Sequence, residues 1–541
     1  MKITRYITVF LVAAPFFTSC VDMDQEFERG TFSESTKLNI LEQMPSRASG
    51  ELYGLYNTIA SPYPMGYSDA ADDGGYPLIC AFFDMNGPDC SAGDDGYNWL
   101  STSSQWADRH DNYRNPYLRW ALFYKQIKAA NDIINSNDPA TAKSLIGQAL
   151  CVRAFDYLCL APYYQYGPAE APNELCVPFV DGTTNELAYA RNTTKEVYDH
   201  IIADLTTAIE YLEGYERPSQ VNADQSVAYG LRARAYLVLE KWAEAAADAT
   251  KAIEVSGAEP YSMEDVKNPT KSFYQLDPNW LWGLKMTESM VDGAYQSWPS
   301  WIGSFSANAY STGVQEYDRI NVLLWSLIPE TDVRKGWWVD EELKSDHLDG
   351  VTWSVAGVSL QGNKIATENV PDVKMPYVPY TNVKFGFNPS GDLAKNGGDW
   401  PIMRVEEMIL IQAEAYAMAG DEAKGKQILT DFVTKYRNPK YEQYCSNFQD
   451  EVWMQRRIEL WGEGFSMFDI MRLRKPVVRF NNRIESNLPD AFQFNLAHED
   501  PIMLAIIPQG EMNSNSLMVQ NPIGKEPTPG DGAGLLDGVT D

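Results

Sequence analysis

A pair of predicted helices carries small and aromatic side chains in an arrangement that restricts the fold more than any other part of the sequence. These side chains fall at the offsets of a tetratricopeptide unit, and they are Ala233, Tyr236, Trp242, Ala245, Ala249 and Ala252. Small residues let two helices approach closely, and the rings fill the remaining gap. A weaker copy occurs at Ala413, Tyr416 and Gly420. Because such hairpins stack into a solenoid, we expect a mainly α fold with a tetratricopeptide-like helical-hairpin scaffold.

Other helices are indicated by apolar residues at helical spacing. The first runs through Ile127 to Ile134, the second through Ile146 to Leu158, and the third begins at a Thr194 cap. Helical order returns over residues 403–436 and 449–474. Residues 61–115 and 257–400 lack a sustained period and are rich in Gly, Pro, Asn and Asp, so we expect two large, irregular, loop-rich inserts on the helical scaffold. The tail after Pro508 is expected to be loop, with a mobile Gly-rich end.

Aromatic residues make up 12% of the chain, and they are unevenly placed. Eight of the 15 Trp lie between Trp280 and Trp353, where uniform spacing would put about two. For most of the eight we expect a packing role, in which large apolar side chains pin a region without regular structure. Two to four of them would form a platform for sugar rings, since ligand pockets combine apolar walls with a few polar groups.

The insert at 61–115 supplies both aromatic rings and polar side chains. Rings would stack on the C–H face of a sugar, while carboxylates and guanidinium groups at the rim would bind its hydroxyls. The predicted ligand-binding residues are Tyr97, Trp99, Trp106, Asp72, Asp73, Arg109, Trp298 and Trp301.

The chain carries 74 acidic and 44 basic side chains, which gives a formal charge of −30. This balance argues against nucleic acid as a partner, because phosphate binding needs clustered Lys and Arg. It also argues against a broad contact with anionic lipid. With 541 residues, the chain is long enough to bury a large core without metal or disulfide staples.

The N-terminus has the form of a secretory signal. Lys2 and Arg5 precede an apolar run over residues 6–17, and small residues then lead to Cys20. The run is too short for a membrane-spanning anchor, which needs about 20 residues. Cys20 sits where bacterial lipoproteins are cut and acylated, so we expect residues 1–19 to be a lipoprotein signal peptide and Cys20 to be lipidated. The alternative is a simple signal peptide with an unrelated Cys.

No cofactor is expected. The six Cys after Cys20 contain no CxxC pair, and the four His are not spaced as metal ligands. Cys80 and Cys90 flank a Gly/Asp loop and could form a disulfide. The run from Asp69 to Gly74 resembles a calcium loop only loosely, which leaves a structural calcium in the acidic loops as an open alternative.

Residues 420–426 match the frame of a phosphate-binding P-loop, but other features favour a structural role. Gln427 replaces the Ser or Thr that would hold magnesium, and the segment joins two helices where a P-loop follows a strand. Gly420 is better interpreted as the end of a helix.

Several ordered segments resemble the SusD/RagB family of nutrient-uptake lipoproteins. The most specific are RRIELWGEG at 456–464, followed by DIMR at 469–472, and RVEEMILIQAEA at 404–415. Others are ALCVRAFDY at 149–157 with YYQYG at 163–167, residues 197–205, and the endings IIPQGE at 506–511 and QNP at 520–522. Arg457, Glu459, Glu463 and Asp469 are charged residues on an otherwise apolar helix. We expect them to pair with each other or with Arg404 and Glu406, since buried charges need partners.

The resemblance implies an N-terminal helical half over residues 20–240 and a C-terminal half over 241–541. It implies a surface-exposed, lipid-anchored protein of the outer membrane that binds oligosaccharides and does not cleave them. It also implies a partner, a TonB-dependent outer-membrane transporter of the SusC type, over which the protein sits as a lid. Two alternatives stay open: the same role with peptide cargo, and a lipid-anchored glycoside hydrolase.

Overall fold

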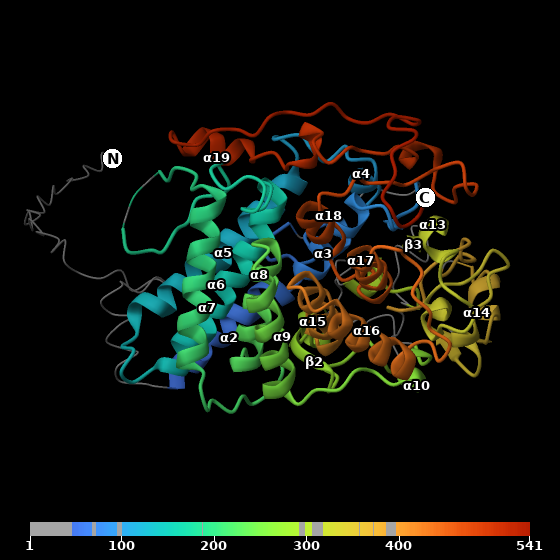
Figure 1. The fold of residues 1–541 in the computed structure, drawn as a ribbon, viewed down its shortest axis with the longest axis horizontal. Coiled ribbons are helices and arrows are strands. Elements are labelled where there is room, and N and C mark those ends of the chain that lie inside the picture. The colour runs from blue at the N-terminus through green and yellow to red at the C-terminus, as the bar shows by residue number, and fades with distance from the viewer. Residues whose placement is uncertain are drawn as a thin grey trace, which may run out of the picture. The chain divides into compact units, whose positions relative to one another are not determined.

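The computed structural model describes residues 46–67, 72–94, 100–184, 186, 188–291, 298–305, 317–355, 357–371, 373–385 and 397–541. Residues Gly50–Asp541 form one compact unit, to which the following description applies. Its long helices pack against one another in chain order as antiparallel neighbours, seen side by side in teal and green in Figure 1. They are α5 (Arg114–Ser136), α6 (Lys143–Tyr164), α7 (Thr194–Tyr211), α8 (Gln225–Val238) and α9 (Trp242–Ser256).

The scaffold continues after a long interruption. Helix α15 (Val405–Met418) packs on α9, and α16 (Glu422–Tyr436) and α17 (Phe448–Glu459) then pack on α15. The intervening residues therefore leave the stack of hairpins and return to it, as an insert does. This arrangement confirms the predicted mainly α fold with helical hairpins and is consistent with the tetratricopeptide-like detail.

The hairpin of α8 and α9 is built as its sequence predicts. Ala233 on α8 and Ala245, Ala249 and Ala252 on α9 are all 0% exposed, so the two backbones approach with only methyl groups between them. Helix α9 then ends at Gly257, which adopts a left-handed conformation with a φ of 60°.

Helix α6 is the central helix of the scaffold. It is long and apolar enough to cross a membrane, but 89% of its most apolar window is buried inside the protein. Its neighbours α5 and α7 cover it on two sides, and α18 (Ser466–Leu473) also contacts it. Its apolar character is therefore that of a core helix.

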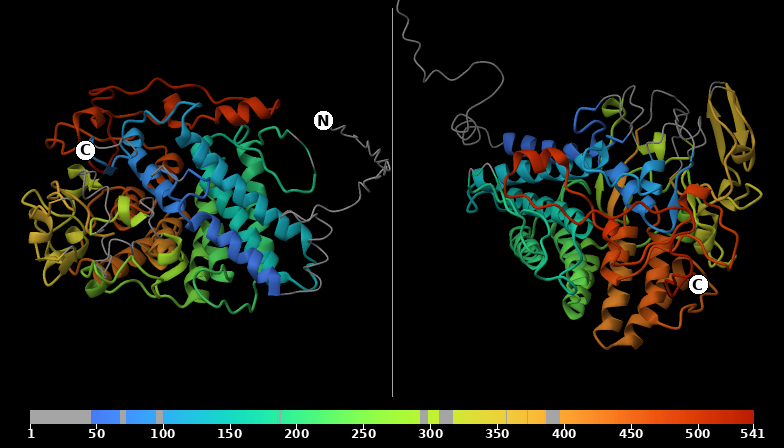
Figure 2. Two further views of the ribbon diagram at one scale, coloured as in Figure 1. Left: turned by 180° about the vertical axis from the view of Figure 1, so that it is seen from behind. Right: turned by 90° about the horizontal axis from the view of Figure 1, so that it is seen from above.

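The two predicted inserts are joined by short strands. Strand β1 (Cys90–Ser91) of the first insert pairs antiparallel with β3 (Arg319–Ile320) of the second. Strand β2 (Trp280–Leu284) pairs with β6 (Trp400–Arg404), which brings the second insert back to the start of α15. Strands β4 (Thr352–Val355) and β5 (Val358–Gln361) form a hairpin that lies at the edge of the right-hand view in Figure 2.

The remaining helices complete the described residues. The α-helices are α2 (Ser46–Ala60), α3 (Tyr76–Asn86), α4 (Ser101–Ser104), α10 (Met263–Val266), α11 (Trp298–Trp301), α13 (Val322–Trp325), α14 (Lys364–Thr367) and α19 (Gln509–Ser514). The 3-10 helices are Glu288–Met290, Val333–Trp337, Asp346–Leu348, Asp490–Phe492 and Pro501–Met503. The inserts thus hold more local structure than expected. The helix α3 has 11 residues, and the other helices within the inserts span about one turn, which is too short to show a period.

Helix α17 and the turn that follows it carry the predicted charge network. The Glu459 carboxylate lies 2.8 Å from Arg437 and 3.3 Å from Arg404, and the surrounding guanidinium groups hold its pKa well below its usual range. Glu463 lies 2.8 Å from both Arg404 and Lys384. The expectation of pairing with Arg404 is confirmed for these two carboxylates.

For Arg457 and Asp469 the predicted partners were wrong. Arg457 binds Asp89 of the first insert at 2.7 Å and Asp537 of the C-terminal tail at 2.9 Å. Asp469 binds Arg456 and Arg472, each at 2.8 Å. The Gly-rich end of the chain was expected to be mobile, but Asp537 is 2% exposed and its ion pair with Arg457 fastens the chain end to α17. The tail after Pro508 was expected to be loop, but it contains the helix α19 (Gln509–Ser514).

The possible disulfide is absent. Cys80 in α3 and Cys90 in β1 are both buried free thiols, as are Cys151, Cys176 and Cys445, and Cys159 is a free, partly buried thiol. Burial raises the pKa of the Cys80 thiol.

Candidate functional site: an aromatic groove along helix α5

The structure places the predicted ligand-binding residues in different environments. Tyr97 and Trp99 lie outside the described residues, so their role stays a prediction. Trp106 and Arg109 come together, with the guanidinium 4.6 Å from the indole centroid, but both are turned inward. Trp106 is 0% exposed and its indole N–H donates to the carbonyl of Asn86 at 3.0 Å.

Asp72 and Asp73 hold the first insert in shape. The Asp73 carboxylate accepts hydrogen bonds from the backbone N–H groups of Met65 and Tyr67, and Asp72 forms an ion pair with Arg114 at 2.9 Å. Burial raises the pKa of both carboxyl groups. In the described part of the chain no group of three or more His, Cys, Asp or Glu is arranged to hold a metal ion.

Trp298 and Trp301 of α11 belong to the core. They are 0% and 1% exposed, and the Trp298 indole N–H donates to the carbonyl of Gly398 at 2.7 Å. In this conformation a buried ring offers no face to a sugar. Of the eight Trp between Trp280 and Trp353, seven are at most 3% exposed, so the packing role expected for most of them is confirmed. Trp325 is the partly exposed one.

A groove of about 560 Å³ runs along α5. One wall is an aromatic stripe formed by Tyr117, Trp120 and Tyr124, which lie on one face of α5 because they are three and four residues apart. The opposite wall comes from the loop that holds Pro178 and Tyr189 and from the neighbourhood of α19. Figures 1 and 2 show α19, in red, beside the end of the α5–α7 layer.

Hydrogen bonds hold the groove together. Between the two walls, the Tyr124 hydroxyl donates to the carbonyl of Pro178 at 2.7 Å. Within the opposite wall, the Asn515 side chain donates to the carbonyl of Tyr189 at 2.8 Å. The Gln509 N–H donates to the carbonyl of Asp111, just ahead of α5, at 2.8 Å. The groove is therefore formed before any ligand binds, which lowers the entropic cost of binding.

The lining of the groove suits a neutral ligand with apolar faces and hydroxyl groups. Tyr117 is 36% exposed and contacts Tyr67 edge to face at 6.3 Å, so an aromatic surface extends from the groove toward the first insert. Burial raises the pKa of Tyr117 and Tyr124, which keeps both hydroxyls protonated at neutral pH. Lys125, Lys128 and Glu511 supply charged groups at the rim.

The groove lacks the pair of carboxylates that glycoside hydrolysis requires. Glu511 is the single acidic residue among the described residues that line it, and its carboxylate accepts a hydrogen bond from Asn515 at 2.8 Å. Hydrolysis by the usual mechanisms needs a second carboxylate about 5–9.5 Å away. The arrangement is suited to binding.

Sequence reasoning missed the groove, although one wall leaves a signal. Tyr113, Tyr117, Trp120 and Tyr124 are spaced by four, three and four residues, which is an aromatic stripe on one helical face. The stripe begins inside the predicted insert at 61–115, and α5 begins at Arg114, so the assumed boundary hid it. The other wall comes from residues far along the chain, and no local pattern indicates that contact.

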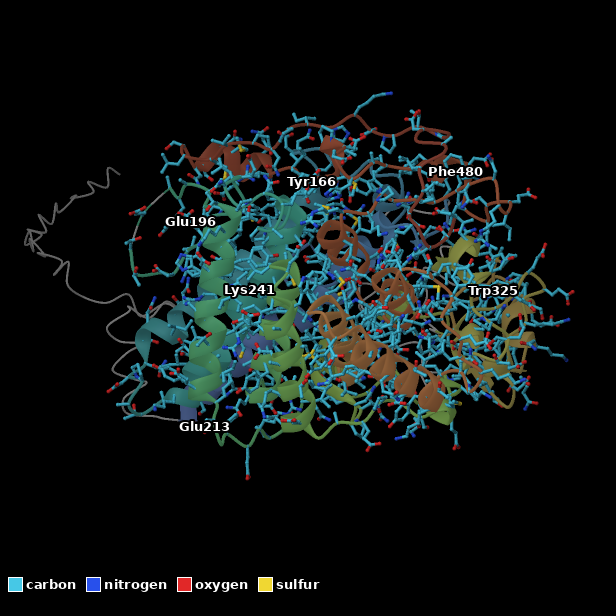
Figure 3. The ribbon with its side chains drawn as sticks, in the orientation of Figure 1. Tyr166, Glu196, Glu213, Lys241, Trp325 and Phe480 are labelled. Carbon is cyan, nitrogen blue, oxygen red and sulfur yellow. The ribbon has the colours of Figure 1, made fainter. Side chains whose placement is uncertain are left out.

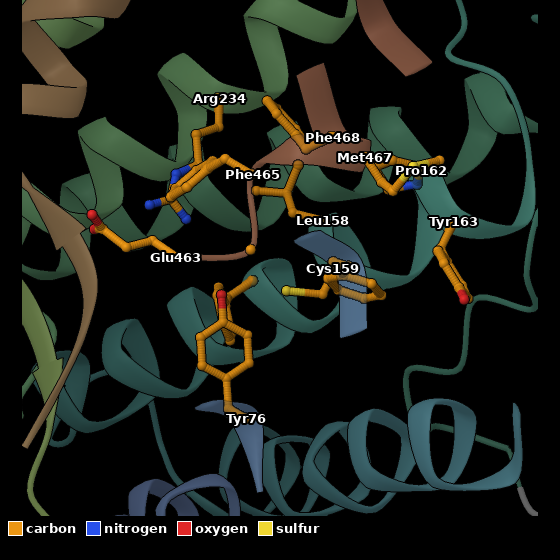
Figure 4. Close-up of a pocket in the computed structure, with 13 residues that line it drawn as sticks. Tyr76, Leu158, Cys159, Pro162, Tyr163, Arg234, Glu463, Phe465, Met467 and Phe468 are labelled. Atoms are coloured by element: carbon orange, nitrogen blue, oxygen red, sulfur yellow. The ribbon is translucent and has the colours of Figure 1, made fainter. Parts of the chain in front are cut away.

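A second hollow is too small for such a ligand. Its volume is about 50 Å³, whereas pockets for organic ligands have about 300–1,000 Å³. Figure 4 shows Tyr76 and Cys159 on one side and Phe465 and Phe468 on the other. This hollow is a gap in the packing of α18 on α3 and α6.

Comparisons with known proteins agree with this fold. A family model described as "Starch-binding associating with outer membrane" matches residues 65–237, and the model of the SusD family matches residues 347–523. No curated protein sequence matches the chain.

Solved structures share the fold over nearly their whole length. A SusD-like carbohydrate binding protein from Bacteroides vulgatus has a TM-score of 0.68 at 23% identity, covering 87% of this chain and 97% of its own. Surface glycan-binding protein A from Bacteroides uniformis has a TM-score of 0.64 at 16% identity, covering 88% and 99%. A laminarin-binding SusD-like protein has a TM-score of 0.61 at 17% identity, with the same coverage. Because SusD-type family models match residues 65–237 and 347–523, the chain belongs to the SusD/RagB family.

Proposed function

We propose that the protein is a surface lipoprotein that captures oligosaccharides and delivers them to a SusC-type TonB-dependent transporter in the outer membrane. The observation that carries the proposal is the α5 groove, which joins a preformed aromatic wall to a polar rim. The family models and the names of two similar structures, a surface glycan-binding protein and a laminarin-binding protein, support the same class of ligand.

Capture by the groove follows from the chemistry of a sugar ring. The C–H face of a pyranose packs on an aromatic plane, and its hydroxyls exchange hydrogen bonds with the rim. Tyr117 is the ring that reaches furthest into solvent, while Trp120 is 5% exposed and supports it from within the same face of α5. Binding thus removes the apolar face of the sugar from water, while the hydroxyl groups of the sugar keep hydrogen-bond partners.

The predicted ligand face of the two inserts is a second part of the proposal. Pairing of β1 with β3, and the contact of α11 with α3, support a surface to which both inserts contribute. Tyr97 and Trp99 remain the proposed contacts there. The anchor at Cys20 and the role as a lid on the transporter rest on the N-terminal sequence and on the family.

The groove is tested by titrating the purified full chain with oligosaccharides of laminarin, starch, cellulose, mannan and xylan in a calorimeter. Tyr117→Ala and Tyr189→Ala should each weaken the binding of the preferred sugar about tenfold, which corresponds to about 1.4 kcal/mol. Tyr53→Ala is the matched control, since Tyr53 is 62% exposed on α2 and does not line the groove. Equal affinity in all three variants would exclude the groove as the site.

The same titration separates the other candidate functions. Tight binding of peptides with no sugar bound would replace the oligosaccharide with peptide cargo in the same role. Release of shorter sugars during a long incubation would identify a hydrolase, which the single groove carboxylate argues against.

A further inference from the structure

The α5 groove is closed at one end by a loop that lies directly on the helix. Lys128 is the last residue of α5 that lines the groove. Beyond it, the Asn131 side chain donates to the carbonyl of Val180 at 2.8 Å, and the Asn135 side chain donates to the carbonyl of Asp181 at 2.9 Å. The loop therefore crosses α5 at the point where the groove ends.

The contact between this loop and α5 leaves no room for a sugar. Asn131 follows Tyr124 by seven residues, so both side chains lie on the groove face of the helix. A Cβ at Gly182 would lie 3.0 Å from the Cβ of Asn131. Carbon atoms in contact normally stay about 3.5–4.0 Å apart, so the loop and the helix are already as close as they can be. A sugar chain that follows the groove in this direction meets the loop and stops there.

The start of α7 anchors the far end of the same loop. The Thr193 N–H donates to the Glu196 carboxylate at 2.8 Å, and the Thr193 hydroxyl accepts from the Glu196 N–H, which forms a capping box. Figure 3 labels Glu196 at the same end of the unit as α19. The closed end of the groove is thus fastened to both α5 and α7 before a ligand binds.

Near the start of α5 the groove opens onto exposed aromatic rings instead. Tyr117 lines the groove and is 36% exposed, whereas Trp120, one turn further in, is 5% exposed. Tyr67 of the first insert meets Tyr117 edge to face at 6.3 Å and is 40% exposed. The Arg114 guanidinium lies 5.6 Å from the centroid of the Tyr67 ring and pairs with Asp72 at 2.9 Å, which holds this ring in place. An aromatic surface thus leads out of the groove at this end.

We propose that the α5 groove receives one end of an oligosaccharide chain and that the following sugar units leave it over Tyr117 and Tyr67. The inference rests on the proposed function and adds to it which part of the polymer is recognised. A terminal sugar carries a free hydroxyl where an internal sugar carries the next unit, so only a terminal sugar fits against the closed end. Each unit that reaches Tyr67 adds a contact within the same complex, so affinity should rise with chain length and then level off.

The stoichiometry of binding tests recognition of the chain end. The full chain is titrated calorimetrically with size-fractionated, linear chains of the sugar that binds best in the groove titration. The number of protein molecules bound per sugar chain should stay the same as the chains become longer, because the number of ends does not change. A number that rises in proportion to chain length would overturn the inference, since internal units would then bind as well.

The variant Tyr67→Ala tests the path out of the groove. Tyr67 does not line the groove, so the shortest chain that binds should keep its affinity in this variant. Longer chains should bind about tenfold more weakly, as expected for the loss of one aromatic contact. Tyr444→Ala is the matched control, since Tyr444 is 56% exposed between α16 and α17 and should change neither affinity. Equal affinity of Tyr67→Ala and the wild type at every chain length would overturn the path over Tyr67, and thermal melting checks that both variants are folded.

The outcomes separate this inference from the proposed function. Binding that Tyr117→Ala weakens, with a stoichiometry that rises with chain length, overturns the chain-end inference and leaves the proposed function standing. No binding of any saccharide by the wild type overturns both. Constant stoichiometry together with a loss in Tyr67→Ala that is confined to longer chains supports the chain-end inference.

Discussion

At the scale of single residues, Asp156 has an environment unlike that of other buried acids in the protein. It lies within α6, is 0% exposed, and neither carboxylate oxygen has a hydrogen-bond partner among the described residues. Burial raises its pKa well above the ordinary value. By contrast, burial raises the pKa of Asp204 less, because Arg153 binds its carboxylate at 2.7 Å.

The raised pKa of Asp156 makes stability depend on pH with a definite sign. In the unfolded chain the carboxyl ionises above about pH 4, while in the folded protein it keeps its proton to a higher pH. Its contribution to stability is thus fully present below about pH 4 and is lost as pH rises toward the folded pKa. Each unit of pH in this window costs about 1.4 kcal/mol.

Asp156→Asn removes this titration while keeping the shape of the side chain. We expect the variant to match the wild type near pH 4 and to exceed it in free energy of unfolding at pH 7. Urea denaturation at both pH values measures the difference. Equal stability of the two proteins at pH 7 would show that Asp156 ionises at its ordinary pKa.

At the scale of elements, the hairpins could be predicted from the sequence and the groove could not. The positions of Ala233 and Ala245 indicate helix pairing because small residues at helical spacing have few other uses. The groove needs Tyr117 on α5 and Asn515 beyond α19 to meet, and only the folded chain brings them together. Trp298 and Trp301 are residues of the type that forms a sugar platform, but both rings are buried. Composition alone does not distinguish a ring that faces the core from one that faces solvent.

Gly425 has a packing role between α15 and α16. It lies in the segment that resembles a P-loop, and a Cβ at this position would lie 2.5 Å from the carbonyl oxygen of Ala413. The glycine thus permits the close approach of the two helices and needs no bound phosphate to explain it. Gly420 ends α15 with a φ of +100°, in keeping with its predicted role.

Gly425→Ala should therefore destabilise the protein. Overpacking against backbone costs about 1–3 kcal/mol, which exceeds the gain of about 1 kcal/mol in helix propensity. Gly54→Ala is the control, since nothing lies within 4 Å of its added Cβ in α2, and it should leave stability unchanged or raise it. Thermal melting of the two variants measures both effects, and a higher melting temperature for Gly425→Ala would refute the close approach.

At the scale of the whole molecule, α17 connects segments distant in sequence. Arg457 binds Asp89 from the first insert and Asp537 from the tail. Glu459 binds Arg334 of the second insert and Arg437, which follows that insert in the chain. The inserts are therefore fastened to the scaffold by buried ion pairs, and breaking one partner of such a pair is costly. The charged residues of α17 could be recognised in the sequence. Their partners lie in loops far along the chain, and no local sequence pattern indicates which of these loops contact α17.

The proposed membrane anchor at Cys20 also concerns the whole molecule. Each buried methylene of an acyl chain contributes about 0.8 kcal/mol, so several acyl chains on Cys20 would hold the protein on a membrane. Cys20→Ser should release the protein from the membrane fraction after cell lysis, as measured by immunoblot of the separated fractions. Retention of Cys20→Ser in that fraction would point to an anchor elsewhere.

Hydrogen–deuterium exchange with the preferred oligosaccharide tests the central claim, capture of a sugar in the α5 groove, most directly. At saturating ligand, exchange should slow in the segments that form the groove walls, around residues 117–128, 178–189 and 508–515. Residues of α2, which line no part of the groove, should exchange at the same rate with and without ligand. If the exchange rates of all three groove segments stay unchanged while the sugar is bound, the account is contradicted.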